Sequence, residues 1–227
     1  MKNDTKVQAG QHLHSEACSC GFPGRRRFIK AGLLAGTGLM LSHETVRANS
    51  MQALTGGVFV NRRYAAEGTP VGPGDIVTVA HGGSASFTLG DDAYLLRGGT
   101  SLKIEGENHA MVSILRLFTG ALLGVFGHGE KLIATRAATI GIRGTGIYLD
   151  TAPERTYFCT CYGETELNAS GLERRVIRAE HHQAYMIETP RHGRNEIHGM
   201  AGFEYHSDDE LRAAEALQGR KVPFDQG

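Results

Sequence analysis

Short runs of alternating apolar and polar residues follow one another through most of the chain after about residue 56. From Ser84 to Leu89 every second side chain is apolar, which predicts a strand with one buried face before a turn at Gly90-Asp91-Asp92. Turn signals such as Gly98-Gly99, Glu105-Gly106 and Gly127-His128-Gly129 separate the runs. We predict further strands at Tyr94 to Leu96, Leu102 to Ile104, Met111 to Leu117, Ala121 to Phe126, Leu132 to Thr135, Thr139 to Ile142, Ile147 to Leu149, Thr156 to Tyr162 and Val176 to Arg178. Strands at intervals of roughly 8 to 12 residues are typical of a β-sandwich, a jelly roll or a β-solenoid, so we expect an all-β fold.

The C-terminal end of the chain has a helical pattern instead. Ser207-Asp208-Asp209-Glu210 is a capping box, in which the serine hydroxyl and the glutamate carboxylate accept hydrogen bonds from the free backbone N–H groups of a helix start. Leu211, Ala214 and Leu217 then share one face, and Gly219 suits the end of the helix. We expect a short helix that packs against the sheet.

The first 48 residues have the features of an export signal. Paired arginines before a Phe and a Lys, followed by an apolar run from Ala31 to Leu41, are typical of a twin-arginine (Tat) signal. The residues that carry it are Arg25, Arg26, Arg27, Phe28 and Lys30. We expect cleavage after Ala48, and an uncleaved signal would leave a membrane anchor. The expected partner is the Tat export machinery and the expected location the periplasm. The expected organisation is a signal segment at 1–48, a β domain at 49–200 and a helical tail at 201–227.

The charge balance argues against a nucleic-acid partner. Residues 1–48 hold seven of the 24 basic and three of the 24 acidic residues, so the rest of the chain keeps 17 basic and 21 acidic residues. Its formal net charge is therefore −4, without a block of like charges. A mildly acidic chain has no electrostatic attraction for phosphate backbones, and we expect no nucleic-acid binding.

Cys159 and Cys161 form the only cysteine pair outside the first 48 residues. They lie two apart in a predicted strand, so both thiols point to one face, and a disulfide between them would distort the strand. Two parallel thiols are half of a site for copper, zinc or iron. His181 and His182 lie on the next predicted hairpin, where strand alternation lets at most one ring reach the thiols easily. Further candidates are His192, His198 and His206. The alternative is that the cysteines are small apolar core residues and the histidines are solvated.

Arg143-Gly144-Thr145 is the tightest local motif of the chain. The glycine permits a close backbone approach, and the guanidinium offers five donors to an anionic ligand. The motif is thus a candidate binding site. The interpretation we favour is structural, with Arg143 paired to an internal acid such as Asp75 or Asp150.

The sequence offers little support for catalysis. Several acids fall at predicted turns, where carboxylates accept backbone hydrogen bonds; these are Asp75, Asp91, Asp92, Asp150 and Glu164. The chain contains neither a Gly-x-Ser-x-Gly elbow nor a His-Glu-x-x-His helix. We therefore expect a protein that is not an enzyme.

Several segments, in the right order, resemble the FecR domain, the periplasmic module of iron-dicitrate-type sensor proteins. These segments are Gly74 to Thr78, Ala85 to Asp92, Leu117 to Leu122, Ile133 to Thr135, Ala138 to Ile147 and Tyr157 to Leu167. The resemblance covers roughly residues 68 to 190 and implies a jelly-roll-like β-sandwich that acts by binding. Only 24 residues precede Arg25, so we expect no cytoplasmic anti-sigma domain and no direct control of a sigma factor.

Two functional hypotheses follow from the sequence. The first is an exported, non-catalytic, FecR-like binding or sensor module that recognises a ligand or protein partner in the cell envelope. The second is a periplasmic metal-binding or thiol-redox protein that uses Cys159 and Cys161 with a histidine. Replacing both cysteines would abolish only the second function.

Overall fold

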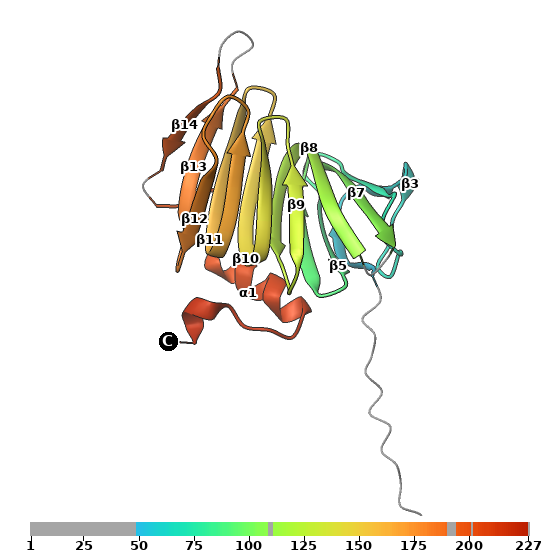
Figure 1. Ribbon diagram of the computed structural model, residues 1–227. Helices are drawn as coiled ribbons and strands as arrows, with labels where there is room; N and C mark the ends of the chain where they lie inside the picture. Colours follow the sequence, from blue (N-terminus) through green and yellow to red (C-terminus); the bar gives the residue numbers. More distant parts are fainter. Residues whose placement is uncertain (1–48, 109–110, 190–193, 201, 227) are drawn as a thin grey trace, which may run out of the picture. The chain divides into compact units, whose positions relative to one another are not determined.

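The computed structural model describes residues 49–108, 111–189, 194–200 and 202–226. The predicted signal residues Arg25 to Lys30, the cleavage position after Ala48 and His192 lie outside these ranges. The described residues form a β-sandwich with one C-terminal α-helix, which confirms the predicted all-β fold (Figure 1). Among them, no helix combines the length and the apolar character that crossing a membrane requires.

The 14 strands of the described residues belong to one hydrogen-bonded network that folds over into two layers. The first layer contains strands β3 (Arg63–Tyr64), β2 (Val58–Val60), β4 (Ile76–Val79), β7 (Ser101–Asn108), β9 (Glu130–Ala134) and β12 (Arg175–Ala179). The second layer contains β1 (Met51–Thr55), β5 (Ser84–Leu89), β6 (Asp92–Arg97), β13 (Gln183–Glu188) and β14 (Glu196–Gly199). Strands β8 (Met111–Val125), β10 (Ala138–Ala152) and β11 (Arg155–Ala169) run through both layers.

Each of the three long strands changes its partners along its length. The first part of β8 pairs with β7 and β9, whereas Gly120 to Val125 pair with β10 and, in part, with β6. Likewise, the first part of β11 pairs with β13 and the last part with β12. Every described pairing except β8 with β9 is antiparallel. This pairing is that of a sandwich rather than of a β-solenoid, which was the alternative from the sequence.

Glycines occupy the points where the long strands bend from one layer into the other. Gly120 in β8 has φ +82°, and a Cβ there would lie 2.5 Å from the Cα of Thr100. Gly163 in β11 has φ +88°, and a Cβ there would lie 2.6 Å from Cγ2 of Thr145. Any larger residue would therefore meet both a strained backbone and a steric clash.

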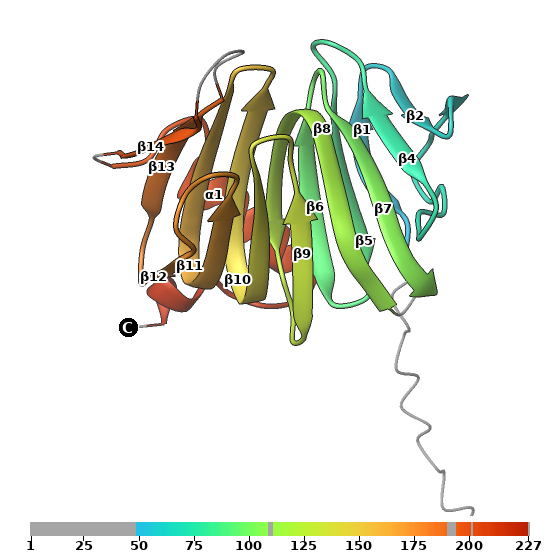
Figure 2. The ribbon, with the colours of Figure 1, turned by 45° about the horizontal axis from the view of Figure 1, so that its top comes forward.

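Two apolar cores result, one on each side of the second layer. Alternation along β10 places Ile147 and Leu149 in the core between the two layers, and Tyr148 on the opposite face. That opposite face forms a second core with helix α1 (Asp208–Leu217) and the residues after it. In Figure 2 the first layer lies in front, and α1 is visible behind the strands.

Helix α1 begins as predicted. Ser207 accepts a hydrogen bond from the backbone N–H of Glu210, and the Glu210 carboxylate accepts one from the N–H of Ser207, which completes the capping box. Leu211 and Ala214 are fully buried in the second core. The short turn Pro223–Asp225 (η1) follows the helix.

The predicted strand boundaries differ from the structure at the bends. We expected separate strands before and after Gly120, and before and after Gly144, but β8 and β10 each continue through these positions. The turn expected at Glu105-Gly106 is an irregularity within β7. In each case the glycine changes the direction of the strand, and the backbone hydrogen bonding between strands continues on both sides of it.

The bend at Gly120 can be tested by comparing two alanine substitutions at nearly identical backbone angles. Gly171 has φ +80°, and no atom lies within 4 Å of the position that a Cβ would take, so Gly171→Ala introduces backbone strain alone. We expect it to lower the free energy of unfolding by about 1 to 2 kcal/mol. Gly120→Ala adds the clash with Thr100, and we expect a loss of about 2 to 5 kcal/mol in urea denaturation. Equal losses for the two variants would contradict the steric argument.

Candidate metal centre

Four side chains from three separate parts of the chain meet at one point in the second core. They are Cys159 and Cys161 of β11, His182 of the turn between β12 and β13, and His206 of the segment before α1. One ligand atom of each, a sulfur or a ring nitrogen, lies within 4.8 Å of the corresponding atom of the others. The sequence had placed the two thiols and one of the two adjacent histidines in such a group, with His206 as a further candidate.

The pleat of β11 directs both thiols into the second core. Phe158 lies in the core between the layers, and Cys159 and Cys161 project from the opposite face. Both cysteines are fully buried and neither forms a disulfide. They are therefore two free sulfurs on one face of a strand that is held on both sides by neighbouring strands.

His182 is fixed by its backbone and by both ring nitrogens. Its φ is +50°, in the left-handed region, and its N–H donates to the carbonyl oxygen of Cys161 at 2.8 Å. Nε2 lies 2.7 Å from Oδ1 of Asp208, and Nδ1 lies 3.6 Å from the sulfur of Cys159. The ring of Phe203 stacks on the imidazole at a centroid distance of 3.6 Å. Only 3% of the His182 side chain is exposed.

His206 approaches the cluster from the other side. Its Nδ1 lies 2.8 Å from the carbonyl oxygen of Glu204, so this nitrogen carries the proton and donates it. Its Nε2 lies 3.3 Å from the sulfur of Cys161 and 3.3 Å from Nδ1 of His182. The ring stacks on Tyr148 with an interplanar angle of 9°.

The hydrogen bonds that the two histidines make outside the cluster determine which ring nitrogens face its interior. A neutral imidazole has one N–H and one lone pair, and both N–H groups are directed outward, to Asp208 and to the carbonyl of Glu204. When both rings are neutral, the nitrogens that face each other across 3.3 Å both present lone pairs. Lone pairs at this separation repel each other unless a proton or a metal ion lies between them. The arrangement of outward carboxylate and carbonyl partners is the one that metal-binding histidines show.

Three of the six separations between ligand atoms are close to the edges of a tetrahedral metal site. Bond lengths of about 2.3 Å to sulfur and 2.0 to 2.1 Å to nitrogen give edges of about 3.3 Å between two nitrogens and about 3.6 Å between sulfur and nitrogen. The corresponding separations here are 3.3 Å between the nitrogens, and 3.6 Å and 3.3 Å between sulfur and nitrogen.

The side chains of the cluster differ in how readily they ionise. The neighbouring Cys161 thiol, with His182 and His206, lowers the pKa of Cys159 although burial opposes ionisation. Burial and the adjacent Cys159 raise the pKa of Cys161 well above its usual value. Burial disfavours charge on His182, but its bonds to Cys159 and Asp208 raise its pKa overall. Burial also opposes ionisation of Asp208, but the bonds from His182 and His181 lower its pKa. One thiolate already forms readily in the absence of metal.

Of the other candidate histidines, the two that the structure describes, His181 and His198, do not reach the sulfurs. His181 is about half exposed, and its Nε2 lies 3.1 Å from both carboxylate oxygens of Asp208. His198 is exposed on β14 beside Glu196. Asp208, which no pattern in the sequence marked as part of the site, instead links His181 and His182 to the first turn of α1.

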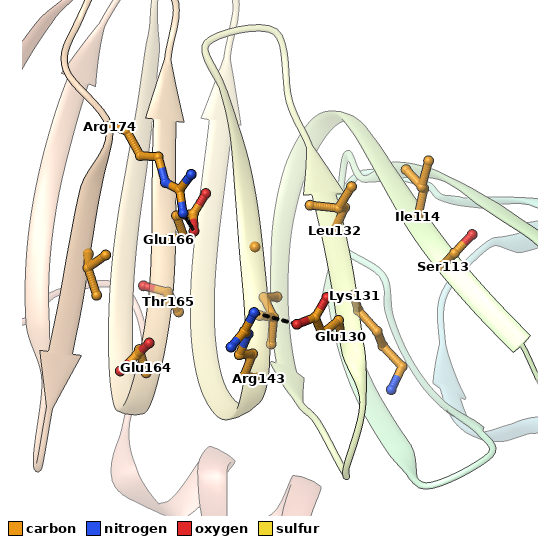
Figure 3. A pocket seen from close by; sticks show the side chains of 13 residues that line it. Ser113, Ile114, Glu130, Lys131, Leu132, Arg143, Glu164, Thr165, Glu166 and Arg174 are labelled. Carbon is orange, nitrogen blue, oxygen red and sulfur yellow. Dashed lines mark hydrogen bonds and ion pairs between the residues drawn. The ribbon is translucent and has the colours of Figure 1, made fainter.

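Arg143 occupies a different place from the one we expected. It pairs with Glu130, which lies opposite it in the β9–β10 register, and not with Asp75 or Asp150. Both side chains are exposed and line a groove of about 520 Å³ on the outer face of the first layer (Figure 3). Thr145 is buried, so the three residues of the motif do not form one surface. Arg174 pairs with Glu166 within this groove, whereas its Lys131 pairs with Asp92 and its Glu164 with Arg178.

Asp92 is the most buried of the acids considered for catalysis, and its contacts are structural. Its carboxylate accepts hydrogen bonds from the N–H of Gly127 and the hydroxyl of Tyr94, and it pairs with Lys131. Burial raises the pKa of Asp92, against these favourable partners. The carboxylate joins β6 to the segment between β8 and β9.

Comparison with known proteins identifies no family for the chain. It matches no known family profile and no curated protein. Two crystal structures of a proposed anti-sigma factor from Parabacteroides distasonis match at 15% and 17% sequence identity, each with a TM-score of 0.45. The matches cover 55% of this chain and 59% of that protein, which is less than two thirds of its length. The resemblance to FecR domains stays a prediction from the sequence motifs.

Proposed function

We propose that this protein is a metal-binding module of the cell envelope, in which Cys159, Cys161, His182 and His206 bind one metal ion. The observation that carries the proposal is the convergence of two imidazole nitrogens, 3.3 Å apart, with two buried sulfurs. Two sulfurs and two nitrogens with outward hydrogen-bond partners form a complete set of tetrahedral ligands.

Zinc is the metal that this ligand set fits best. Closed tetrahedral sites with two cysteines and two histidines are typical of structural Zn²⁺. Copper(I) and iron, which the thiols alone also suggested, share the preference for sulfur, and elemental analysis separates the three metals directly. A closed set of four protein ligands leaves no position for a substrate, so the proposed role is binding and not catalysis.

The proposed metal site also joins the two hypotheses from the sequence. The FecR-like segments suggest a sensor or regulatory module, and the metal is then the ligand or the structural switch of that module. The twin-arginine signal suggests export in a folded state, which suits a protein whose metal site is closed before export.

The proposal predicts about one zinc per chain in protein purified after export. Cys159→Ser with Cys161→Ser should abolish this content because both sulfur ligands are lost. His198→Ala is the matched control, since His198 is an exposed histidine away from the cluster. The measurement is elemental analysis by mass spectrometry, with circular dichroism to verify that the variants are folded. Zinc-free wild-type protein, or equal zinc in the double-serine variant, would refute the proposal.

Asp208 should strengthen metal binding without being a metal ligand itself. Asp208→Asn keeps the size of the side chain but removes the charge that holds Nε2 of His182, and we expect the metal dissociation constant to rise about 10- to 100-fold. Asp209→Asn removes the same charge from the same helical turn, at an exposed position that contacts Arg212. We expect this control to bind like wild type in a competition titration with a chromophoric chelator. Parallel losses in both variants would assign the effect to the helix terminus.

Export by the twin-arginine route can be tested while the charge of the signal is preserved. Replacing Arg25, Arg26 and Arg27 with lysine should leave the protein in the cytoplasm, because the route recognises paired arginines and not charge alone. Arg47→Lys, near the proposed cleavage position, should leave export unchanged. The measurement is the share of protein in the periplasmic fraction, and unchanged export of the triple variant would exclude this route.

A further inference from the structure

The segment that carries His206 is attached to the rest of the protein differently from the other ligands. Residues Gly202–His206, which we call the arm, contain no helix or strand, and His206 is their only buried residue. Within the described part of the chain, the arm makes no backbone–backbone hydrogen bond. The position of the arm therefore depends on side-chain contacts, including those of His206 within the cluster.

Side-chain contacts hold the arm in place, and one of its residues is strained. The ring of Phe203 stacks on His182, the ring of His206 stacks on Tyr148, and the ring of Tyr205 lies edge-on to Tyr157. The N–H of Glu204 donates to the hydroxyl of Tyr157 at 2.9 Å, and Nη2 of Arg97 donates to the carbonyl oxygen of Tyr205 at 2.8 Å. Tyr205 has φ +68°, a conformation that costs a non-glycine residue on the order of 1 to 3 kcal/mol and that persists only where neighbours enforce it. The closed position of the arm thus depends on side-chain contacts that hold a strained residue.

The other three ligands stay in place if the arm opens. Cys159 and Cys161 lie inside β11, which β10 and β13 flank on both sides. His182 remains bonded through its N–H to the carbonyl of Cys161. Helix α1 has anchors of its own in the second core, where Leu211 and Ala214 are fully buried. Opening of the arm therefore needs neither unfolding of the sheet nor release of the helix.

We propose that the arm is the gate of the metal centre and that His206 is a detachable ligand. The metal first binds to Cys159, Cys161 and His182, and closure of the arm adds His206 and covers the ion. Release follows the reverse order. This inference rests on the proposed metal binding and extends it, since it describes a centre that exchanges its metal and not a permanently closed one.

The rate of metal transfer tests the gate. Arg97→Ala removes the contact to Tyr205 and the ion pair with Glu210 but no ligand. Arg212→Ala is the matched control, because Arg212 is similarly exposed, forms ion pairs involving the helix, and lies 5.9 Å from a ring centroid as Arg97 does. In stopped-flow transfer of Zn²⁺ from the full-length protein to a chromophoric chelator, we expect Arg97→Ala to be about fivefold faster than wild type. Arg212→Ala should remain at the wild-type rate.

The detachable ligand has a spectroscopic test. With Co²⁺ in place of zinc, Arg97→Ala should keep the visible bands of a tetrahedral site with two thiolates. His206→Ala should still bind Co²⁺, at least about 100-fold more weakly, with altered bands that added imidazole restores. Cys161→Ser should lose the thiolate-to-metal charge transfer in proportion to the lost sulfur.

The outcomes distinguish the gate from the metal site. If the wild-type protein binds neither Zn²⁺ nor Co²⁺, the proposed function fails and the gate with it. If it binds both, but His206→Ala loses all Co²⁺ or Arg97→Ala transfers zinc at the wild-type rate, the gate is refuted and the metal site stands. Faster transfer in Arg97→Ala alone, with imidazole rescue of His206→Ala, supports the gate.

Discussion

The sharp bending of three long strands is the constraint on which the rest of the structure depends. Because β8, β10 and β11 each pass from one layer into the other, the two layers cannot be assembled independently. The bends require glycine where the backbone is left-handed and a neighbouring strand lies too close for a side chain, as at Gly120 and Gly163. They also fix the register that decides which residues of β11 face each core.

This register places both thiols of the proposed metal site on one face of β11. Within β11, Phe158 packs in the core between the layers, and the opposite face of the strand packs in the second core. Two cysteines on that second face add sulfurs to a core that is otherwise aromatic and aliphatic. The histidines donate hydrogen bonds of their own, to the carboxylate of Asp208 and to the backbone carbonyl of Glu204, so the cluster adds few unsatisfied groups to the interior.

The sequence was informative where a local pattern decided the outcome. Alternation located the central strands, the capping box located α1, and the spacing of Cys159 and Cys161 placed both thiols on one face. Strands β2 and β4 were missed, although the sequence had predicted other strands as short as Tyr94 to Leu96. The partner histidines could not be chosen from sequence, because His182 reaches the thiols through a left-handed backbone and His206 through the return of the chain over the second layer. Arg143 paired with Glu130 because the β9–β10 register, which no local pattern specifies, placed them opposite each other.

The order of the ligands along the chain would couple occupancy of the proposed metal site to folding. Two ligands come from the middle of the sheet, the third from the turn between β12 and β13, and the fourth from the segment before α1. A chain whose second core has not formed would present at most part of the ligand set and would hold the ion weakly. Occupancy of the proposed site would therefore report that the second core is complete.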